Sequence, residues 1–436
     1  MQFTQLARTL MPRYAHITGW GHAVPERVLT NDEIAQMVDT SDEWIRTRTG
    51  IRERRIASPD ESTATLAARA AEEALRKARV APTQVDLILV ASSTPEYIFP
   101  ATAALVQDAI GATRAGAADI SAACTGFIYA LSLAAAMIKA GEIETALVIG
   151  AETLSRIVDW EDRNTCILFG DGAGALVLEA SDEPGGVITS VLRADGSGAD
   201  LLILPTCGSR HPVSHEALDQ KMHYVKMNGR EVFRFATRVM ARATREVVEK
   251  AGMTLDDIAW IAPHQANRRI IEAAAKSLRR PIDDFLMNLD RYGNTSTASI
   301  PLVLYEAAEA GRLKPGDYGV LVGFGAGLTW GAALVQWTGP KAERKPVRLK
   351  WYQRLARVRS RLRQWRRTLE GWWVHLLERV HSASWPRPAL PLRRGRRGQP
   401  RALPRQTEAP GPDAAREQGE APAEPGAEPR SEREAP

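Results

Sequence analysis

Strand-like and helix-like segments alternate along the first 340 residues, and this order limits the folds that the chain can adopt. Apolar runs typical of buried strands cover residues 85–91, 146–150 and 318–322. Between them, residues 62–80 and 230–251 carry apolar side chains at helical spacing. Regular alternation of this kind predicts a layered α/β fold built on a largely parallel sheet.

The order of segments also repeats, which indicates a duplicated fold. In the first half, a strand at 85–90 is followed by a helix and a second strand that leads to Cys124. In the second half, a strand at 258–262 is followed by a helix at 266–278 and a strand toward Asn294. Each half then ends in a Gly-rich pair of strands. The predicted halves span residues 12–183 and 184–340.

The charge of the chain is concentrated in its C-terminal part. Residues 341–405 carry about +17 and residues 406–436 about −5, so the first 340 residues carry about −7 although the whole chain is +5. The basic balance therefore belongs to the C-terminal extension. It gives no reason to expect that the globular part binds nucleic acid.

The chain has three cysteines, and their odd number and wide spacing predict neither a disulfide framework nor a zinc site. We expect a reducing cytoplasm and no bound metal. Residues 1–12 lack the apolar run of a signal peptide, and Met11 is an alternative start to Met1. No run of 18 apolar residues occurs, so we expect no membrane span.

Cys124 lies between a strand-like segment at 117–122 and a small-residue helix at 125–137. A cysteine at a helix N-terminus meets unpaired N–H groups and the positive end of the helix dipole, which predicts a stabilised thiolate. Position alone leaves an inert buried cysteine equally open, because most free cysteines are of that kind.

His264 and Asn294 supply two further polar groups near strand ends. His264 follows an apolar strand and precedes a helix, which places it at the carboxyl end where α/β folds hold ligands. Taken alone, His264 would be interpreted as a structural residue, and Asn294 as a helix cap or a turn residue. The glycines at 323–331 form either a tight strand junction or an oxyanion hole of backbone N–H groups.

Taken together, the thiol, imidazole and carboxamide favour carbon–carbon bond formation on thioesters over proteolysis or metal binding. A thiol can accept an acyl group, and the other two groups can donate hydrogen bonds to one carbonyl oxygen. Six ordered motifs over about residues 12–338 resemble the beta-ketoacyl-acyl-carrier-protein synthase III family of the thiolase superfamily. The motifs are Thr40-Ser-Asp-Glu-Trp-Ile-Arg-Thr-Arg-Thr-Gly-Ile-Arg-Glu-Arg54, Ala-Ala-Cys124-Thr-Gly, Phe169-Gly-Asp-Gly-Ala-Gly, Pro263-His-Gln-Ala-Asn-Arg-Arg269, Gly293-Asn-Thr-Ser and Gly325-Ala-Gly-Leu-Thr-Trp-Gly331.

This resemblance implies a five-layer αβαβα fold and a decarboxylative condensation that starts fatty-acid synthesis. A short acyl-CoA would acylate Cys124, with the oxyanion held by the backbone N–H groups of Cys124 and Ala326. Malonyl-acyl carrier protein would then lose carbon dioxide, with its enolate stabilised by His264 and Asn294, to give 3-oxoacyl-acyl carrier protein. The resemblance implies no cofactor, because acyl-CoA is a substrate. Asn294 in place of a second cysteine argues against a thiolase.

The resemblance also assigns binding residues. Trp44 and Arg163 would hold the CoA adenine between them by cation–π stacking, and Asn267 would order water near the site. Trp44 as a core anchor and Arg163 as a solvated loop charge are the alternatives. Phe99 would close the acyl pocket from the partner subunit of a homodimer and favour a short primer.

Three basic residues near the expected pocket mouth are candidates for docking the acidic carrier protein: Arg268, Arg269 and Lys276. Solvated helix charges are an equal alternative. Two other functions stay open. One is a related condensing enzyme of polyketide or hydrocarbon synthesis with a different acceptor. The other is a membrane-associated scaffold that works through the C-terminal extension.

The extension continues beyond the end of ordinary members near residue 338. The pattern of residues 346–382 predicts a basic, Trp-rich amphipathic helix. Three roles stay open for it: binding an anionic membrane surface, docking an acidic partner, or folding back on the core. Residues 383–436 are rich in Pro, Arg, Glu and Ala, which predicts disorder. The apolar stripe of the helix consists of Trp351, Leu355, Val358, Leu362, Trp365, Leu369, Trp372 and Leu376.

Overall fold

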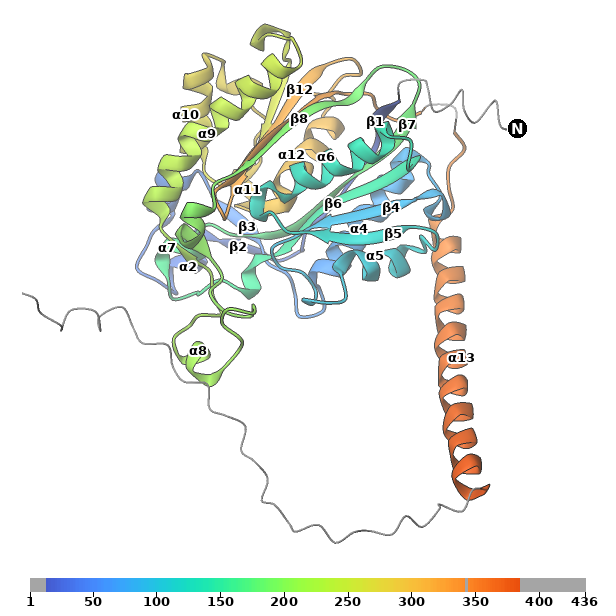
Figure 1. Cartoon of the computed structure of the whole chain (residues 1–436). Coiled ribbons are helices and arrows are strands. Elements are labelled where there is room, and N and C mark those ends of the chain that lie inside the picture. The colour runs from blue at the N-terminus through green and yellow to red at the C-terminus, as the bar shows by residue number, and fades with distance from the viewer. Residues whose placement is uncertain (1–12, 342–343, 385–436) are drawn as a thin grey trace, which may run out of the picture. The chain divides into compact units, whose positions relative to one another are not determined.

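The computed structural model describes residues 13–341 and 344–384, and two β-sheets form its centre (Figure 1). The first sheet has five strands and the second has four. In spatial order the first sheet holds β1 (Tyr14–Ala23), β7 (Asp171–Ser181), β6 (Thr145–Thr153), β4 (Leu87–Ala91) and β5 (Gly116–Ile120). The second holds β11 (Trp260–Pro263), β12 (Tyr318–Gly325), β13 (Thr329–Gln336) and β8 (Gly186–Ala194).

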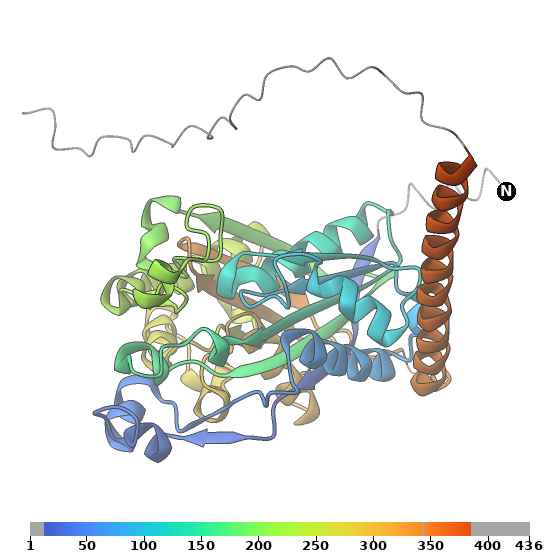
Figure 2. The ribbon, with the colours of Figure 1, turned by 90° about the horizontal axis from the view of Figure 1, so that it is seen from below.

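Helices cover the outer faces of both sheets and fill the space between them (Figures 1 and 2). Three apolar clusters join the layers, and the central one joins both sheets to the inner helices. This confirms the five-layer αβαβα prediction. The outer helices are α4 (Thr63–Ala78) and α5 (Thr102–Ile110) on the first sheet, and α9 (Gly229–Lys250) and α10 (Arg268–Leu278) on the second. The inner pair is α6 (Gly126–Lys139) and α12 (Ser299–Glu309).

The second sheet repeats the strand order of the first. Each strand of the second sheet has a counterpart at the same place in the first: β11 matches β4, β12 matches β6, β13 matches β7 and β8 matches β1. Where the second sheet would need an equivalent of β5, Phe285 forms a single parallel bridge with Ile261. Cys124 follows β5 and Asn294 follows the Phe285 segment, so the duplication brings both residues to equivalent places in the two halves.

The pairing within the sheets is mixed, and the prediction of largely parallel sheets is wrong. Strand β4 is parallel to β5 and β6, and β11 is parallel to β12. In contrast, β7 is antiparallel to both β6 and β1, and β13 is antiparallel to both β12 and β8. The tight turn between β12 and β13 permits only antiparallel pairing, because a parallel connection needs a longer crossover.

The helix over 62–80 begins at Thr63 for a local reason. The Ser62 hydroxyl accepts a hydrogen bond from the N–H of Thr65, which caps the helix. It ends at Ala78, after which Arg79 adopts a left-handed conformation with φ 55°. The remaining elements are β2 (Val28–Thr30), α2 (Asn31–Ala35), α3 (Asp42–Thr49), β3 (Glu53–Arg55), α7 (Arg163–Cys166), β9 (Leu202–Ile203), α8 (His215–Asp219), β10 (Lys226–Met227), α11 (Leu289–Tyr292) and α13 (Leu349–Ser384).

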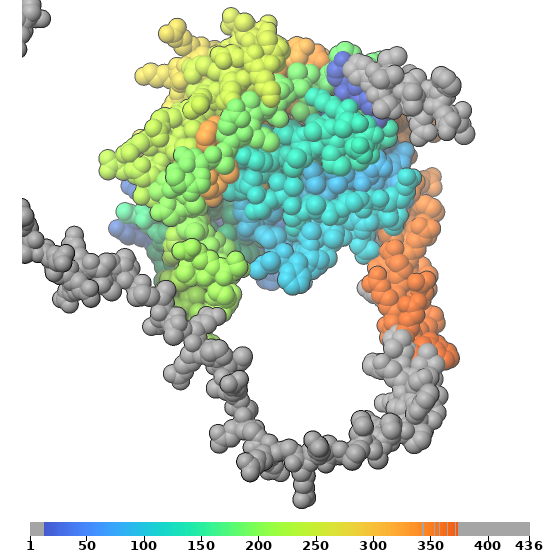
Figure 3. Space-filling model, viewed as in Figure 1, coloured from blue at the N-terminus to red at the C-terminus, as the bar shows by residue number. Residues whose placement is uncertain are grey.

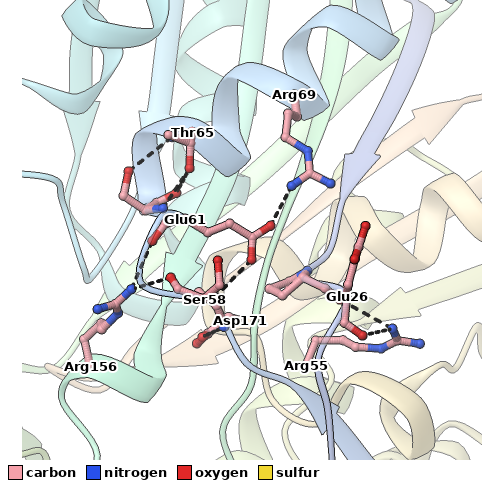
Figure 4. A network of polar contacts seen from close by, with 11 residues as sticks. Glu26, Arg55, Ser58, Glu61, Thr65, Arg69, Arg156 and Asp171 are labelled. Carbon is pink, nitrogen blue, oxygen red and sulfur yellow. Dashed lines mark hydrogen bonds and ion pairs between the residues drawn. The ribbon is translucent and has the colours of Figure 1, made fainter.

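Asp171, within the Phe169-Gly-Asp motif, has a structural role beside β7. Its carboxylate accepts hydrogen bonds from the N–H groups of Ala57 and Ser155 at 2.7 and 2.9 Å. The loop that it holds is tied further by Arg156, which donates to the carbonyl oxygens of Ser58 and Glu61 (Figure 4). This polar network fixes the segment between β3 and α4 against the first sheet.

The described chain divides into two compact units, one through Gly371 and one from Trp372. The predicted boundary between the halves falls in the connection between β7 and β8, and the predicted helix over 346–382 corresponds to α13. Within the described residues, no helix is long and apolar enough to cross a membrane. The predictions for the start at Met1 or Met11 and for residues 385–436 lie outside the described residues.

Candidate active site

Cys124, His264 and Asn294 line one cavity of about 80 Å³. The three residues come from both halves, and the structure brings them together as the sequence predicts. All three are buried, with 7%, 1% and 7% of their surface exposed. The rest of the wall is largely apolar and includes Leu168, Phe169, Val232, Phe233, Ile270 and Phe324.

A short turn between β5 and α6 presents Cys124. The hairpin between β12 and β13 packs against this turn, where the hydroxyls of Thr125 and Thr329 lie 3.0 Å apart. Gly325 permits the approach, because a Cβ there would lie 2.7 Å from the backbone nitrogen of Cys124. The next residue in the hairpin is Ala326, so the two N–H groups predicted to form the oxyanion hole belong to segments in contact. Their role stays a prediction.

Burial raises the pKa of the Cys124 thiol to about 12. The Ser296 hydroxyl opposes this shift, whereas the nearby Glu152 carboxylate adds to it. This shift favours the neutral thiol at rest, against the stabilised thiolate that the helix N-terminus predicts. The physical reason is that Cys124 is buried. The favourable field at the N-terminus of helix α6 does not offset the loss of hydration that a thiolate would suffer there.

His264 is held as a neutral imidazole. Burial lowers its pKa from 6.5 to about 3. Its backbone N–H donates to the carbonyl oxygen of Val322 at 2.8 Å, and its ring meets Phe324 edge to face. Its Nδ1 lies 2.7 Å from the Ser299 hydroxyl. With that hydroxyl donating to Nδ1, the proton resides on Nε2, which then serves as a hydrogen-bond donor.

Hydrogen bonds hold Asn294 through its backbone groups and through the oxygen of its side-chain amide. Its N–H donates to the Leu168 carbonyl oxygen at 2.8 Å, and its own carbonyl oxygen accepts from Gly170 at 3.0 Å. Its Oδ1 accepts from the N–H of Ser296 at 2.8 Å. The carboxamide therefore turns its Nδ2 donors away from that bond, and the cavity holds two neutral donor groups, one from His264 and one from Asn294.

Glu152 does not line the cavity, but its carboxylate helps to raise the pKa of the Cys124 thiol, and the sequence reasoning missed it. It is fully buried on β6, and its carboxylate accepts from Ser93, Thr94 and, across the two halves, from the Thr297 hydroxyl at 2.9 Å. Burial raises its pKa, although these hydrogen bonds oppose the shift. Its signal in the sequence is one acidic residue that directly continues a wholly apolar strand, where charged residues are rare unless paired.

A second, open cleft lies beside the cavity and shares Met227 and Gly229 with it. Trp44 lines this cleft, and the Arg163 guanidinium carbon lies 5.0 Å from the centre of its ring. The structure thus brings the predicted CoA pair together, with Arg163 already stacked on Trp44. An adenine between them requires that guanidinium to move aside. Further basic residues of the cleft are Arg48, Lys226 and Arg230.

Asn267 lines the cavity and also caps α10. Its Oδ1 accepts from the N–H of Arg269 at 2.9 Å, and its Nδ2 donates to the carbonyl oxygen of Arg48 at 3.0 Å. Its side chain therefore joins α10 to α3. The predicted contact with CoA or its water stays a prediction.

Of the three predicted docking residues, Arg269 lies nearest the cavity, with its guanidinium carbon 5.3 Å from the ring centre of Phe233. Lys276 is seven residues further on α10, which places it on the same face. Arg268 instead forms an ion pair with Glu272 at 2.8 Å. Phe99 does not line the cavity within one chain, and 85% of its surface is exposed. Among the described residues, no cluster of three His, Cys, Asp or Glu side chains could hold a metal ion.

Comparison with known proteins places the chain among enzymes of the kind that this site suggests. The family "3-Oxoacyl-[acyl-carrier-protein (ACP)] synthase III" matches residues 118–196, and its C-terminal family matches residues 248–337. The chain is 57% identical over 321 residues to beta-ketoacyl-[acyl-carrier-protein] synthase III of Symbiobacterium thermophilum, which covers 74% of this chain and 97% of the relative. It is 52% identical over 328 residues to that of Roseiflexus sp. strain RS-1, covering 75% of this chain and 100% of the relative.

A solved structure of beta-ketoacyl-[acyl-carrier-protein] synthase III from Thermus thermophilus superposes with a TM-score of 0.69. It is 50% identical in sequence and covers 74% of this chain and 99% of its own length. The fold and the cavity therefore define a thiolase-fold condensing enzyme, an acyltransferase. Within that class, the chain belongs to the beta-ketoacyl-[acyl-carrier-protein] synthase III family. The remaining quarter of the chain has no counterpart in the Roseiflexus relative.

The raised pKa of Cys124 predicts how the thiol reacts with iodoacetamide. Since only the thiolate is nucleophilic, alkylation of Cys124 should accelerate about tenfold per pH unit between about pH 7 and pH 9, without a plateau. Peptide mass spectrometry resolves Cys124 from the exposed Cys207, which serves as the internal control. A plateau below about pH 8 would instead show that the resting site stabilises a thiolate.

The Ser299 contact predicts a selective defect. In Ser299→Ala, the imidazole of His264 loses the donor that fixes its tautomer, so condensation should slow roughly tenfold while acylation of Cys124 is unchanged. Ser299→Thr keeps a hydroxyl and should restore most of the rate. The two steps are measured separately, by single-turnover acylation and by product formation. Equal rates of condensation for wild type and Ser299→Ala would refute the assigned tautomer.

Proposed function

We propose that the protein catalyses the decarboxylative condensation of a short acyl-CoA with malonyl-acyl carrier protein. The product is 3-oxoacyl-acyl carrier protein, and the reaction initiates fatty-acid synthesis. One observation carries this proposal: the Cys124 thiol and two neutral hydrogen-bond donors, from His264 and Asn294, line one small cavity in which all three residues are buried. The proposed reaction requires no cofactor, because acyl-CoA is itself a substrate.

The first step transfers the acyl group to Cys124. As the bond between Sγ and the acyl carbon forms, the thiol proton passes to the sulfur of the departing CoA, because burial disfavours a free thiolate. The developing oxyanion is held by the N–H groups of Cys124 and Ala326. Each donor of this kind is worth roughly 10²–10³ in rate.

The second step forms the new carbon–carbon bond. The bond from malonyl carbon to carboxylate breaks, carbon dioxide leaves, and the electron pair moves into an enolate at the thioester. Nε2–H of His264 and Nδ2–H of Asn294 donate to that oxygen. The carbanion then attacks the acyl carbonyl carbon, the bond to Sγ breaks, and the Cys124 sulfur takes up a proton. Neither donor needs to ionise, in keeping with the low pKa of His264.

The open cleft supports CoA as the first donor. It shares the lining residues Met227 and Gly229 with the cavity, which suits a ligand whose polar end rests on the surface and whose thioester reaches Cys124. Arg48, Lys226 and Arg230 offer positive charge to phosphates there. Trp44 and Arg163 offer two flat groups for the adenine.

Carrier-protein docking is supported by the exposed faces of α9 and α10. Arg269 and Lys276 share a face of α10. On α9, which packs against α10, exposed arginines recur every fourth residue at Arg230, Arg234, Arg238 and Arg242. This row continues from the open cleft along α9. A surface with this excess of positive charge suits an acidic carrier protein.

We also propose a homodimer. Strand β5 is the outer strand of its sheet, and the nearby Tyr97, Ile98 and Phe99 are 57%, 79% and 85% exposed. A broad surface groove next to this loop is lined in part by Ile98, Ile203 and Leu204. In Figure 3 the residues around 100–120 belong to the light-blue and cyan surface, and those around 200 belong to the green surface. A second copy would cover the open strand and its apolar loop, and would bring Phe99 toward the partner's acyl pocket.

The alternative of a related condensing enzyme with another acceptor is not favoured, because relatives more than half identical carry the synthase III name. The site works with a free thiol, so we propose a reducing cytoplasm as its compartment. The alternative of a membrane-associated scaffold is less favoured, because Cys124, His264 and Asn294 are all present in one cavity. We propose that the extension adds to the enzyme an interaction with an anionic membrane or an acidic partner.

Intact-protein mass spectrometry after incubation with a panel of acyl-CoAs tests the proposed function. We expect one acyl adduct from short acyl-CoAs, because the cavity is small, and none in Cys124→Ala. His264→Ala should still load the acyl group, since its donor acts in the second step. If no acyl-CoA gives an adduct, the CoA-primed function is rejected.

Sedimentation velocity tests the homodimer. We expect a species of about twice the chain mass of 47.8 kDa. The double variant Ile98→Asp and Phe99→Asp should shift it toward the monomer and reduce condensation, because two carboxylates would be buried unpaired. Met37→Asp, at an exposed apolar residue elsewhere, is the matched control. A wild-type chain that sediments as a monomer at micromolar concentration would contradict the proposal.

A further inference from the structure

Helix α13 contacts the core through one face. Ala356 is only 3% exposed, and it lies beside Gly111 at the end of α5. One helical turn on, the Ser360 hydroxyl donates to Asp108 at 3.3 Å, and Arg363 forms an ion pair with the same carboxylate at 3.6 Å. These contacts define a docked face made of Tyr352, Ala356, Ser360 and Arg363, all within the compact unit that ends at Gly371.

The opposite face of α13 is apolar and exposed. We call this set the α13 stripe, and it consists of Trp351, Val358, Leu362, Trp365 and Leu369, which are 57%, 54%, 58%, 65% and 39% exposed. With about 3.6 residues per turn, the part of the stripe from Val358 to Leu369 projects away from the docked face. Trp351, at the start of the helix, lines a surface groove together with Arg69 and Glu73 of α4. The alternative that the helix folds back on the core is therefore met by the docked face, through Ala356 and Ser360, while these larger apolar residues stay exposed.

Positive charge flanks the α13 stripe. Arg354, Arg359 and Arg361 are exposed on the same stretch of helix. Glu370, the acidic residue of this stretch, is paired with Arg366 at 3.1 Å. The stripe is about 27 Å long at about 1.5 Å per residue. A straight line of Trp, Leu and Val with arginines beside it suits the boundary between lipid headgroups and acyl chains.

We propose that the α13 stripe binds the surface of an anionic lipid bilayer. The tryptophans and leucines would enter the boundary region, while the arginines meet lipid phosphates. The docked face would hold the enzyme against the helix as it lies on the membrane. This gives a condensing enzyme a peripheral membrane site that is independent of its catalytic cavity.

The place of the docked face favours a lipid surface over the acidic carrier protein. Asp108 and Gly111 end helix α5, which leads into the amino end of β5, whereas Cys124 follows the carboxyl end of that strand. The stripe therefore lies at the opposite end of β5 from the nucleophile. A carrier protein bound there is not at the mouth of the cavity.

Vesicle co-sedimentation of the full chain tests the proposal. We expect binding to vesicles of equal phosphatidylglycerol and phosphatidylcholine, and little binding to phosphatidylcholine alone. The variant Trp351→Ser, Leu362→Ser and Trp365→Ser should bind at least about tenfold more weakly, since it removes the groups that enter the boundary region. A matched control removes three apolar residues that are similarly exposed on the core, Met37→Ser, Val213→Ser and Leu218→Ser, and should bind as wild type.

Condensation activity of the stripe variant in solution should equal that of wild type, which shows that the variant is folded. Arg354→Gln, Arg359→Gln and Arg361→Gln together should also weaken binding, because the lipid surface is anionic. Equal binding to both kinds of vesicle, or unchanged binding by the stripe variant, would overturn the proposal. So would a wild-type chain that ignores vesicles yet binds purified carrier protein through the stripe.

Discussion

The buried carboxylate of Glu152 holds the two halves of the enzyme together at the catalytic cavity. It lies on a strand of the first half and accepts hydrogen bonds from Thr94 in that half and from Thr297 in the other. Thr297 belongs to the segment that carries Asn294, while Ser296 reaches toward the nucleophile. One buried carboxyl group, satisfied by several donors, thus links the segment of Thr94 to the segment of Asn294 across the two halves.

Burial decides the chemistry of the site as much as residue identity does. The same loss of hydration that keeps Cys124 protonated also keeps His264 neutral. A charged imidazole would attract the malonyl carboxylate and oppose its departure as carbon dioxide, whereas a neutral donor stabilises only the oxygen on which charge develops. Fixed dipoles in a dry cavity act more strongly than they would in water, which is why two neutral groups suffice.

The sequence predicted the features that depend on local pattern. The spans of β4, β6 and α9 followed from apolar periodicity, and Cys124, His264 and Asn294 followed from polar residues placed next to strand ends. Strand direction was predicted wrongly, because the sense of pairing depends on how β7 and β13 return across their sheets, and no local pattern records that path.

Features that depend on contacts between distant segments were also beyond the sequence. The protonation state of Cys124 depends on total burial, and the roles of Glu152 and Ser299 exist only once the halves meet. The face on which α13 docks was beyond the sequence for a related reason. An apolar stripe is a reasonable candidate for core contact, but two small residues fit closely beside Gly111, and the larger side chains stay exposed.

In the proposed mechanism, decarboxylation depends on His264 and Asn294 and does not need the thiol. Release of carbon dioxide from malonyl-acyl carrier protein by Cys124→Ala measures this directly, because that variant cannot form the acyl-enzyme. We expect that Cys124→Ala still releases carbon dioxide, and that adding His264→Ala or Asn294→Ala slows the release roughly 10²-fold or more. Loss of decarboxylation in Cys124→Ala alone, or undiminished decarboxylation without both donors, would show that His264 and Asn294 do not carry this step.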